Sequence, residues 1–277
     1  MTFTFKTSSL FLFSIIFISS CSSPPTNRYQ IRNDRAPDTE IDVSHIPDAV
    51  PKTEPRSQYG NPASYKVRGK TYHVNQDSKG YSQRGVASWY GQKFHGHRTS
   101  SGETYDMYSM SAAHTTLPLP TYARVTHLQN GRSVIVKIND RGPFHDDRLI
   151  DLSYAAAKKL GITANGTGIV EVTAIDPDSY QAQPIAVAQS TPVQNNDTQL
   201  QYGLYLQAGA FVSRSNAEQL RSKLQTIYNE RKITASYYPD NQVYRVRIGP
   251  LASVEEADKL ANDINHKGLA KPHIVVD

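Results

Sequence analysis

Short apolar runs separated by turn residues dominate positions 85–176 of the chain. Their length and their content of valine, isoleucine and tyrosine predict β-strands at 86–90, 122–128, 133–139 and 168–175. Asn130-Gly131 joins the two middle runs, and this dipeptide is typical of a tight β-hairpin. A smaller hairpin is predicted over 64–74, where apolar and polar residues alternate around Arg68-Gly69.

One short helix is predicted in the same region. Asp151-Leu152-Ser153 offers an N-cap, residues 154–160 favour a helix, and Gly161 is placed to end it. Short strands with so little helix predict a small β-barrel.

An internal repeat at an offset of 40 residues marks a second domain over 202–277. The matching pairs are Gly209 and Gly249, Phe211 and Leu251, Ser213 and Ser253, Ala217 and Ala257, and Leu220 and Leu260. Each copy predicts a strand, a capped helix and a return strand. The second helix begins with a capping box, Ser253 with Glu256, and the first begins at Ser213 or at Ser215. The repeat therefore predicts a four-stranded antiparallel sheet with two helices on one face, which leaves the other face free to bind.

Residues 1–20 have the pattern of a secretory signal peptide, with Lys6 preceding an apolar stretch at 10–18. That stretch is too short to cross a bilayer comfortably. The only cysteine, Cys21, follows two serines, as in the lipobox of bacterial lipoproteins, so we expect acyl chains such as palmitate on Cys21. Ser22, where an aspartate would suggest inner-membrane retention, favours an outer-membrane anchor facing the periplasm. The alternative is an ordinary signal peptide with an incidental cysteine.

Composition narrows the choice of protein class. A length of 277 residues suggests about two domains, and a single apolar stretch excludes a multi-spanning membrane protein. One cysteine excludes an intramolecular disulfide and cysteine-cluster zinc sites. The net charge of +5 fits an acidic polymer as partner without identifying it.

The chain divides by composition into five segments. After the signal peptide, residues 21–60 are rich in proline, serine, asparagine and aspartate, which predicts a disordered tether. The barrel domain is expected at 61–178, a largely uncharged linker at 179–201, and the repeat domain at 202–277.

Two polar stretches of the barrel domain hold the candidate chemistry. Asp140 ends an apolar strand and precedes a Gly-Pro turn, so its carboxylate is expected at a barrel rim. Glu103 follows a glycine turn in the other stretch. Two acids near the rings of Trp89, Tyr90, Phe94 and Tyr105 suggest a carbohydrate cleft, because sugars stack on rings and carboxylic acids cleave glycosidic bonds. The alternative is that Asp140 caps a turn or pairs with Arg141, which would make it a poor general acid.

The histidines His95, His97, His114 and His145 form no recognised metal motif, and no metal or cofactor is expected. His114 is either a loop histidine hydrogen-bonded to the backbone or a rim residue near Asp140.

The barrel domain carries one ordered set of motifs: Gly85-Val86-Ala87-Ser88-Trp89-Tyr90-Gly91, Phe94-His95-Gly96, Thr99-Ser100-Ser101-Gly102-Glu103, Ala112-Ala113-His114, Thr116-Leu117-Pro118, Asn139-Asp140-Arg141-Gly142-Pro143-Phe144 and Ile150-Asp151-Leu152-Ser153. Over about residues 60–176 this set resembles the rare lipoprotein A family. The resemblance implies a six-stranded double-psi β-barrel, related to expansins and to the barrel of one class of lytic transglycosylases.

The second domain resembles a SPOR domain through 205–211 (YLQAGAF) and 244–251 (YRVRIGPL). SPOR domains bind peptidoglycan glycan strands stripped of stem peptides, which accumulate at division septa. The resemblance therefore implies that the free sheet face binds such strands. The candidate binding residues are Gln207, Phe211, Tyr244, Arg245 and Arg247, and strand alternation is expected to turn some of them under the helices.

The resemblance implies a septal lytic transglycosylase that cleaves the β-1,4 bond between N-acetylmuramic acid and N-acetylglucosamine. The family's catalytic aspartate falls on Asp140, its second acid on Glu103 and its histidine on His114. Asp140 would protonate the leaving oxygen and then take the proton of the C6 hydroxyl, leaving a 1,6-anhydro end. This needs a protonated Asp140, favoured by burial or by Glu103, and an Arg141 that points away. Trp89, Tyr90, Phe94 and Arg141 are the expected substrate contacts.

Two further functions follow from the sequence. A non-catalytic wall-binding lipoprotein would grip glycan with the barrel, as expansins do. An RNA-binding protein would explain the β-α-β repeat and the basic charge, but the signal peptide argues against a nucleic-acid partner.

Overall fold

The computed structural model describes residue 29 and residues 31–180 and 202–277. The predicted signal peptide, Cys21 and most of the predicted linker lie outside these ranges. Within the described part of the chain, no helix is long and apolar enough to cross a membrane.

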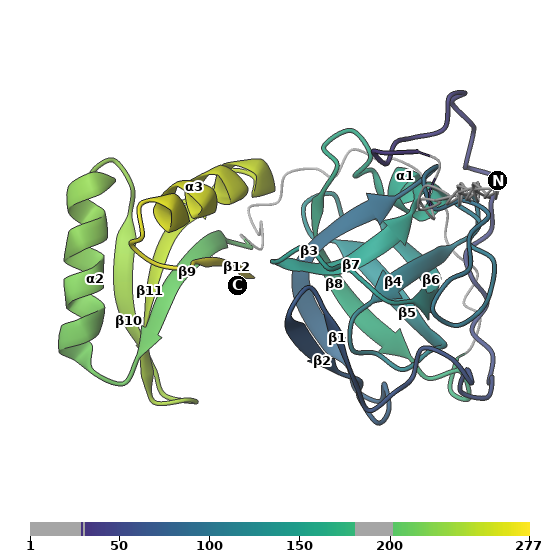
Figure 1. Ribbon diagram of the computed structural model, residues 1–277, viewed down its shortest axis with the longest axis horizontal. Helices are drawn as coiled ribbons and strands as arrows, with labels where there is room; N and C mark the ends of the chain where they lie inside the picture. The colour runs from purple at the N-terminus through teal and green to yellow at the C-terminus, as the bar shows by residue number, and fades with distance from the viewer. Residues whose placement is uncertain (1–28, 30, 181–201) are drawn as a thin grey trace, which may run out of the picture. The chain divides into compact units, whose positions relative to one another are not determined.

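The first domain is a closed six-stranded barrel with the strand order β3-β7-β4-β6-β5-β8 (Figure 1). Its strands are β3 (Ser82–Tyr90), β4 (Ser111–His114), β5 (Thr121–His127), β6 (Ser133–Asp140), β7 (Arg148–Ser153) and β8 (Gly168–Ile175). The pairs β3–β7 and β4–β6 are parallel, and the other pairs are antiparallel. The predicted fold class of this domain is confirmed.

The β5–β6 hairpin shows how the local sequence builds the barrel. Gly131 has a φ of 72°, a conformation that glycine adopts without strain, and its N–H donates to His127 O at 2.9 Å. Along β6, Val134, Val136 and Ile138 alternate into the core, as the period-two pattern requires.

The pattern of apolar and polar residues did not predict strands β4 and β7. All four residues of β4 are buried, so the strand shows no alternation of polar and apolar positions. Its parallel partner β6 is distant in the sequence, which removes the hairpin signal as well.

Helix α1 (Tyr154–Leu160) begins and ends where the sequence predicts. Ser153 Oγ accepts the N–H of Ala156 at 3.2 Å, and Gly161 ends the helix in the left-handed region at φ 84°.

Residues 31–60 differ from the disordered tether expected over 21–60. They lie along the barrel, where Val43 joins the core and the N–H of Ala49 donates to Ile135 O at 3.0 Å. Asp48 also accepts the N–H of Ile135 at 2.9 Å. The composition of this segment is polar, but its few apolar and acidic side chains match specific partners on the barrel. The part of the predicted tether before residue 31 lies outside the described residues, except for residue 29.

The predicted small hairpin is present as β1 (Ser64–Val67) and β2 (Lys70–His73). The turn residues Arg68 and Gly69 both have positive φ values, 49° and 84°, and only the second position has a glycine, which adopts this conformation without strain.

The second domain is a four-stranded antiparallel sheet with the order β10-β11-β9-β12. Its elements are β9 (Leu204–Phe211), α2 (Arg214–Ile227), β10 (Ile233–Tyr238), β11 (Val243–Leu251), α3 (Val254–His266) and β12 (His273–Val276). Both helices bury apolar residues in the same core as the sheet. Ser213 caps α2 and Ser253 caps α3, so Ser213 rather than Ser215 begins the first helix. The predicted repeat and fold of this domain are confirmed.

Candidate functional site

Asp140 lies at the end of β6 with its carboxylate held in a fixed orientation. Its Oδ1 atom accepts three hydrogen bonds: from Ser100 N at 2.7 Å, from Ser100 Oγ at 2.6 Å and from Arg141 N at 2.7 Å. Among the described residues, Oδ2 has no hydrogen-bond partner. The carboxyl group is therefore anchored through one oxygen and presents the other.

The loop 98–104 brings Ser100 and Glu103 to this strand end. Arg98 and Thr104 pair as an isolated β-bridge, and the N–H of Thr99 donates to Glu103 O at 2.8 Å, which closes the loop. The N–H of Ser101 donates to Asn139 O at 3.2 Å and so docks the loop on β6. The two acids predicted from the sequence are thus brought to one strand end by a single loop.

Glu103 is bound to two side chains of β6. Oε1 accepts from Lys137 Nζ at 2.8 Å, and Oε2 accepts from Asn139 Nδ2 at 2.7 Å. Both carboxylate oxygens of Glu103 are thus occupied, which suits an anchoring role in the absence of substrate.

Lys137 links Glu103 to the segment before the barrel. Its Nζ also donates to Glu54 Oε2 at 3.0 Å, and the Tyr122 hydroxyl donates to Glu54 as well. Burial lowers the pKa of Lys137, but the hydrogen bonds that Lys137 donates to Glu103 and Glu54 outweigh burial and raise the pKa overall. Burial likewise raises the pKa of Glu54, but the hydrogen bonds donated by Tyr122 and Lys137 outweigh burial, so the pKa of Glu54 is lowered overall.

Arg141 points away from Asp140, as the proposed acid role requires. Its Nε donates to Gly60 O at 2.8 Å, and its Nη1 donates to His114 O at 3.0 Å and to Leu117 O. Its Nη2 donates to Asn61 Oδ1 at 3.1 Å. These bonds tie the residues before β1 to the turn after β4, so Arg141 acts as a structural clamp rather than as a free substrate contact.

His114 is buried, with 1% of its surface exposed, and its ring hydrogen bonds go to neither acid. Nδ1 accepts the N–H groups of Thr116 at 3.2 Å and Leu117 at 3.0 Å. Nε2 therefore carries the proton and donates to the Tyr81 hydroxyl at 2.9 Å. Burial, with a smaller effect of Arg141, lowers the pKa of His114 to about 3. Of the two alternatives from the sequence, hydrogen bonding to the backbone describes the structure, although His114 ends strand β4 and does not lie in a loop.

The aromatic residues expected to line a cleft form a packed cluster instead. Tyr90 is 8% exposed and stacks on Tyr105 with centroids 4.1 Å apart. Phe94 meets the Tyr90 ring edge-on at 5.9 Å, and Trp89 meets Tyr154 edge-on at 5.7 Å. Tyr90 therefore offers little ring surface to a ligand, because the residue is buried and one face of its ring stacks on Tyr105. Trp89 and Phe94 lie at the edge of the cluster and remain partly exposed.

Asp151 carries a partly buried carboxyl group, for which the sequence indicated no role beyond a helix cap and one of the family motifs. The Ser88 hydroxyl donates to its Oδ1, and burial raises the pKa of Asp151. Strand pairing places Ala113 between Asp140 and Asp151 in the sheet. The sequence signal that could have pointed to Asp151 is an acid between two apolar residues, Ile150 and Leu152, both of which are buried in the structure.

The five candidate residues of the second domain lie on two different faces of its sheet. Phe211 and Tyr244 pack against the core under the helices. Gln207 pairs with Arg247 across β9 and β11, and Arg247 forms an ion pair with Asp277 at the C-terminus.

The face away from the helices alternates rings and cations. The guanidinium groups of Arg245 and Arg247 lie 4.3 and 4.8 Å from the ring centroid of Tyr238, and Arg247 also lies 6.0 Å from that of Tyr205. Tyr205 and Tyr238 were not among the residues expected to bind, because only the strand register fixes the side of the sheet on which they lie.

Family models match both domains of the chain. The family described as "Lytic transglycolase" matches residues 82–174, and the SPOR domain family matches residues 201–276. The crystal structure of the RlpA SPOR domain from Pseudomonas aeruginosa is 36% identical, with a TM-score of 0.25, over 26% of this chain and 97% of that one.

Two relatives match nearly the whole chain. Both are called endolytic peptidoglycan transglycosylase RlpA and come from Pseudomonas aeruginosa strain UCBPP-PA14 and from Vibrio cholerae serotype O1. Each is 40% identical, over 94% of this chain and 93% of the relative. A third, from Neisseria meningitidis serogroup B, is 52% identical over 50% of this chain and 57% of its own length. The chain therefore belongs to the RlpA family.

Proposed function

We propose that this protein is an endolytic peptidoglycan transglycosylase in which Asp140 is the acid and base. The observation that carries the proposal is the geometry of Asp140. Oδ1 accepts three protein hydrogen bonds, and Oδ2 is left without a partner among the described residues. A carboxyl group fixed through one oxygen can carry its proton on the other and deliver it to a substrate atom in a set direction.

In the proposed reaction Asp140 first gives a proton to the substrate and then takes one back. Asp140 Oδ2 gives its proton to the oxygen that links N-acetylmuramic acid C1 to the next N-acetylglucosamine, and the C1–O bond breaks. The C6 hydroxyl of the same muramic acid then attacks C1, and the Asp140 carboxylate takes the hydroxyl proton. The products are a 1,6-anhydro end and a free 4-hydroxyl end, and no water is consumed.

Neighbouring groups have supporting roles in this scheme. Ser100 and the Arg141 N–H hold the Asp140 carboxyl group, and Glu103 fixes the 98–104 loop to β6 through Lys137 and Asn139. His114 is neutral near pH 7 because its pKa is lowered to about 3, so it holds the turn after β4 rather than moving a proton. When substrate enters, Glu103 is placed to exchange one of its partners for a sugar hydroxyl.

The remaining expectations concern the place of action. The lipobox pattern supports acylation of Cys21 and attachment to the outer membrane, facing the periplasm. The ring-and-cation face of the second domain supports binding to glycan strands without stem peptides, which would concentrate the protein at the division septum. The barrel would then cut strands that the SPOR domain holds nearby.

Product analysis tests this proposal. The chain lacking residues 1–21 is incubated with peptidoglycan and with amidase-stripped glycan strands, and the products are identified by mass spectrometry. We expect 1,6-anhydro ends from the stripped strands and their loss in Asp140→Asn. Asp240→Asn, which removes the same charge from an exposed position in the second domain, should cleave like the unsubstituted chain.

The non-catalytic alternative gives the opposite result. A folded protein that retains stripped strands but never shortens them would be a wall-binding protein with an inactive barrel.

A further inference from the structure

One face of the β1–β2 hairpin carries an aromatic pair. The register places Tyr65 opposite Tyr72 and Val67 opposite Lys70, so these four side chains share a face. The two tyrosine rings stack with centroids 5.3 Å apart and an interplanar angle of 18°. The opposite face of the hairpin carries exposed polar residues: Ser64, Lys66, Thr71 and His73.

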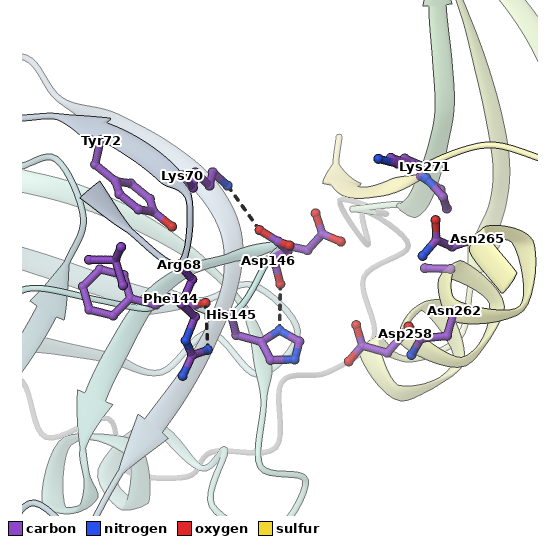
Figure 2. A pocket seen from close by; sticks show the side chains of 14 residues that line it. Arg68, Lys70, Tyr72, Phe144, His145, Asp146, Asp258, Asn262, Asn265 and Lys271 are labelled. Atoms are coloured by element: carbon purple, nitrogen blue, oxygen red, sulfur yellow. Dashed lines mark hydrogen bonds and ion pairs between the residues drawn. The ribbon is translucent and has the colours of Figure 1, made fainter. Parts of the chain in front are cut away.

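Phe144 extends this pair into a cluster of three rings. Its ring meets Tyr72 edge-on at 5.8 Å and Tyr65 at 6.3 Å. Two exposed contacts join the hairpin to the segment that carries Phe144: Arg68 Nη1 donates to Phe144 O at 3.4 Å, and Lys70 Nζ lies 3.3 Å from Asp146 Oδ1 (Figure 2). We call Tyr65, Tyr72 and Phe144 the hairpin cluster.

The hairpin cluster lies against Arg141, the residue that follows the candidate catalytic Asp140. Burial raises the pKa of Tyr65 to about 12; Arg141 opposes this, and Tyr72 and Asp140 add to it. The Arg141 guanidinium lies 5.9 Å from the Tyr65 centroid. Phe144 follows Asp140 by four residues in the chain. The three rings form a row that starts at Tyr65, next to Arg141, and ends at Tyr72 and Phe144, both of which remain partly exposed.

Cations border the outer end of the row. Arg68 and Lys70 are exposed, and Lys70 Nζ lies 5.5 Å from the Tyr72 centroid. In the Lys70–Asp146 ion pair the side chains are 59% and 84% exposed, so the pair contributes little to stability. Lys70 can therefore leave Asp146 for a ligand carboxylate at small cost.

We propose that the hairpin cluster and Lys70 form a binding subsite for an N-acetylmuramic acid residue next to the bond cut at Asp140. A partly exposed ring offers an apolar surface to the C–H face of a sugar. Once its peptide is removed, each muramic acid carries one lactyl carboxylate, which matches Lys70, whereas N-acetylglucosamine carries none. The inference rests on the proposed function, because it assigns the substrate contacts of the same site.

Kinetics on stripped glycan strands separate binding from chemistry. Tyr72→Ala in the chain lacking residues 1–21 should raise KM about tenfold and leave kcat within about twofold. The matched control is His73→Ala, which removes a ring from the adjacent position on the opposite face of the hairpin. An unchanged KM in Tyr72→Ala, or an equal change in both variants, would overturn the subsite.

The cation is tested by a second pair of variants that leave the rings in place. Lys70→Ala should raise KM about threefold on native strands, and Lys66→Ala, the lysine on the other face of the hairpin, should not. On strands whose lactyl carboxyl groups have been reduced to alcohols, the two lysine variants should match. An equal Lys70 effect on native and reduced strands contradicts the carboxylate contact. Because Lys70 is exposed, this arm remains informative if Tyr72→Ala fails to fold.

The unsubstituted chain distinguishes the two proposals. If it forms no anhydro ends, the proposed function and the subsite both fail. If it forms them and Tyr72→Ala forms them with the same KM, only the subsite fails.

Discussion

The buried ring of His114 makes the stability of the barrel depend on pH in a way that one substitution removes. Nδ1 accepts the N–H groups of Thr116 and Leu117, two and three residues ahead. An asparagine side chain makes the same pattern of bonds in an Asx turn. His114→Asn should therefore keep the turn while removing the ionisable ring.

The size of the effect follows from the pKa difference between the folded and unfolded chains. Burial holds the folded pKa at about 3, against 6.5 for an ordinary histidine. Between these values the unfolded chain binds a proton that the folded chain does not, so stability is complete above pH 6.5 and falls with pH toward 3. Between pH 7 and pH 5 this single group should lower the free energy of unfolding by about 2 kcal/mol.

Trp89 makes the assay specific for the barrel. It is the only tryptophan of the chain and packs against Tyr154, so its fluorescence reports barrel unfolding without a signal from the second domain. Urea titrations of both proteins at pH 7 and pH 5 give four free energies of unfolding. Subtracting the pH-dependent change in His114→Asn from the change in the unsubstituted chain removes the contribution of the other titrating groups.

The expected result is that the unsubstituted barrel loses about 2 kcal/mol more than His114→Asn on going from pH 7 to pH 5. Equal losses in the two proteins would show that His114 titrates normally in the folded state. The histidine would then be open to a role in proton transfer, and the reasoning from burial would be refuted.

Three further substitutions test the contacts around the candidate acid. Lys137→Met leaves the carboxylates of Glu54 and Glu103 without their shared cation and should lower the free energy of unfolding at pH 7 by about 1 kcal/mol. Because Lys137 helps to lower the pKa of Glu54, the loss should shrink as the pH falls and Glu54 protonates; a loss independent of pH contradicts this reading. Arg141→Lys cannot satisfy four acceptors and should cost about 2 kcal/mol in the same urea assay, whereas an unchanged midpoint would show that the clamp is dispensable. Ser100→Ala removes one of three donors to Asp140 and should lower kcat about tenfold with KM unchanged; a change in KM alone would make Ser100 a substrate contact instead.

The parts of the fold that follow from local rules were predictable. The Asn130-Gly131 turn, the caps Ser153 and Gly161, and the repeat that relates Ser213 to Ser253 each act over a few residues. The position of Asp140 at a strand end also followed, because an apolar run before a Gly-Pro turn marks where β6 stops.

The parts that depend on distant partners were not predictable. Strands β4 and β7 pair with strands far away in the sequence, and their buried polar residues resemble a loop when read locally. Residues 31–60 look disordered because their stabilising contacts, such as Glu54 with Lys137, exist only once the barrel has formed. The burial of Tyr90 and the neutral ring of His114 likewise follow from tertiary packing.

The fate of water in the reaction tests the central claim most directly. Stripped glycan strands are digested with the chain lacking residues 1–21 in water enriched in oxygen-18, and the new ends are weighed by mass spectrometry. Intramolecular attack by the C6 hydroxyl predicts ends that are lighter by one water than hydrolysis products, carry no oxygen-18, and vanish in Asp140→Asn. New reducing ends labelled with oxygen-18 would show that water is the nucleophile and would contradict the account.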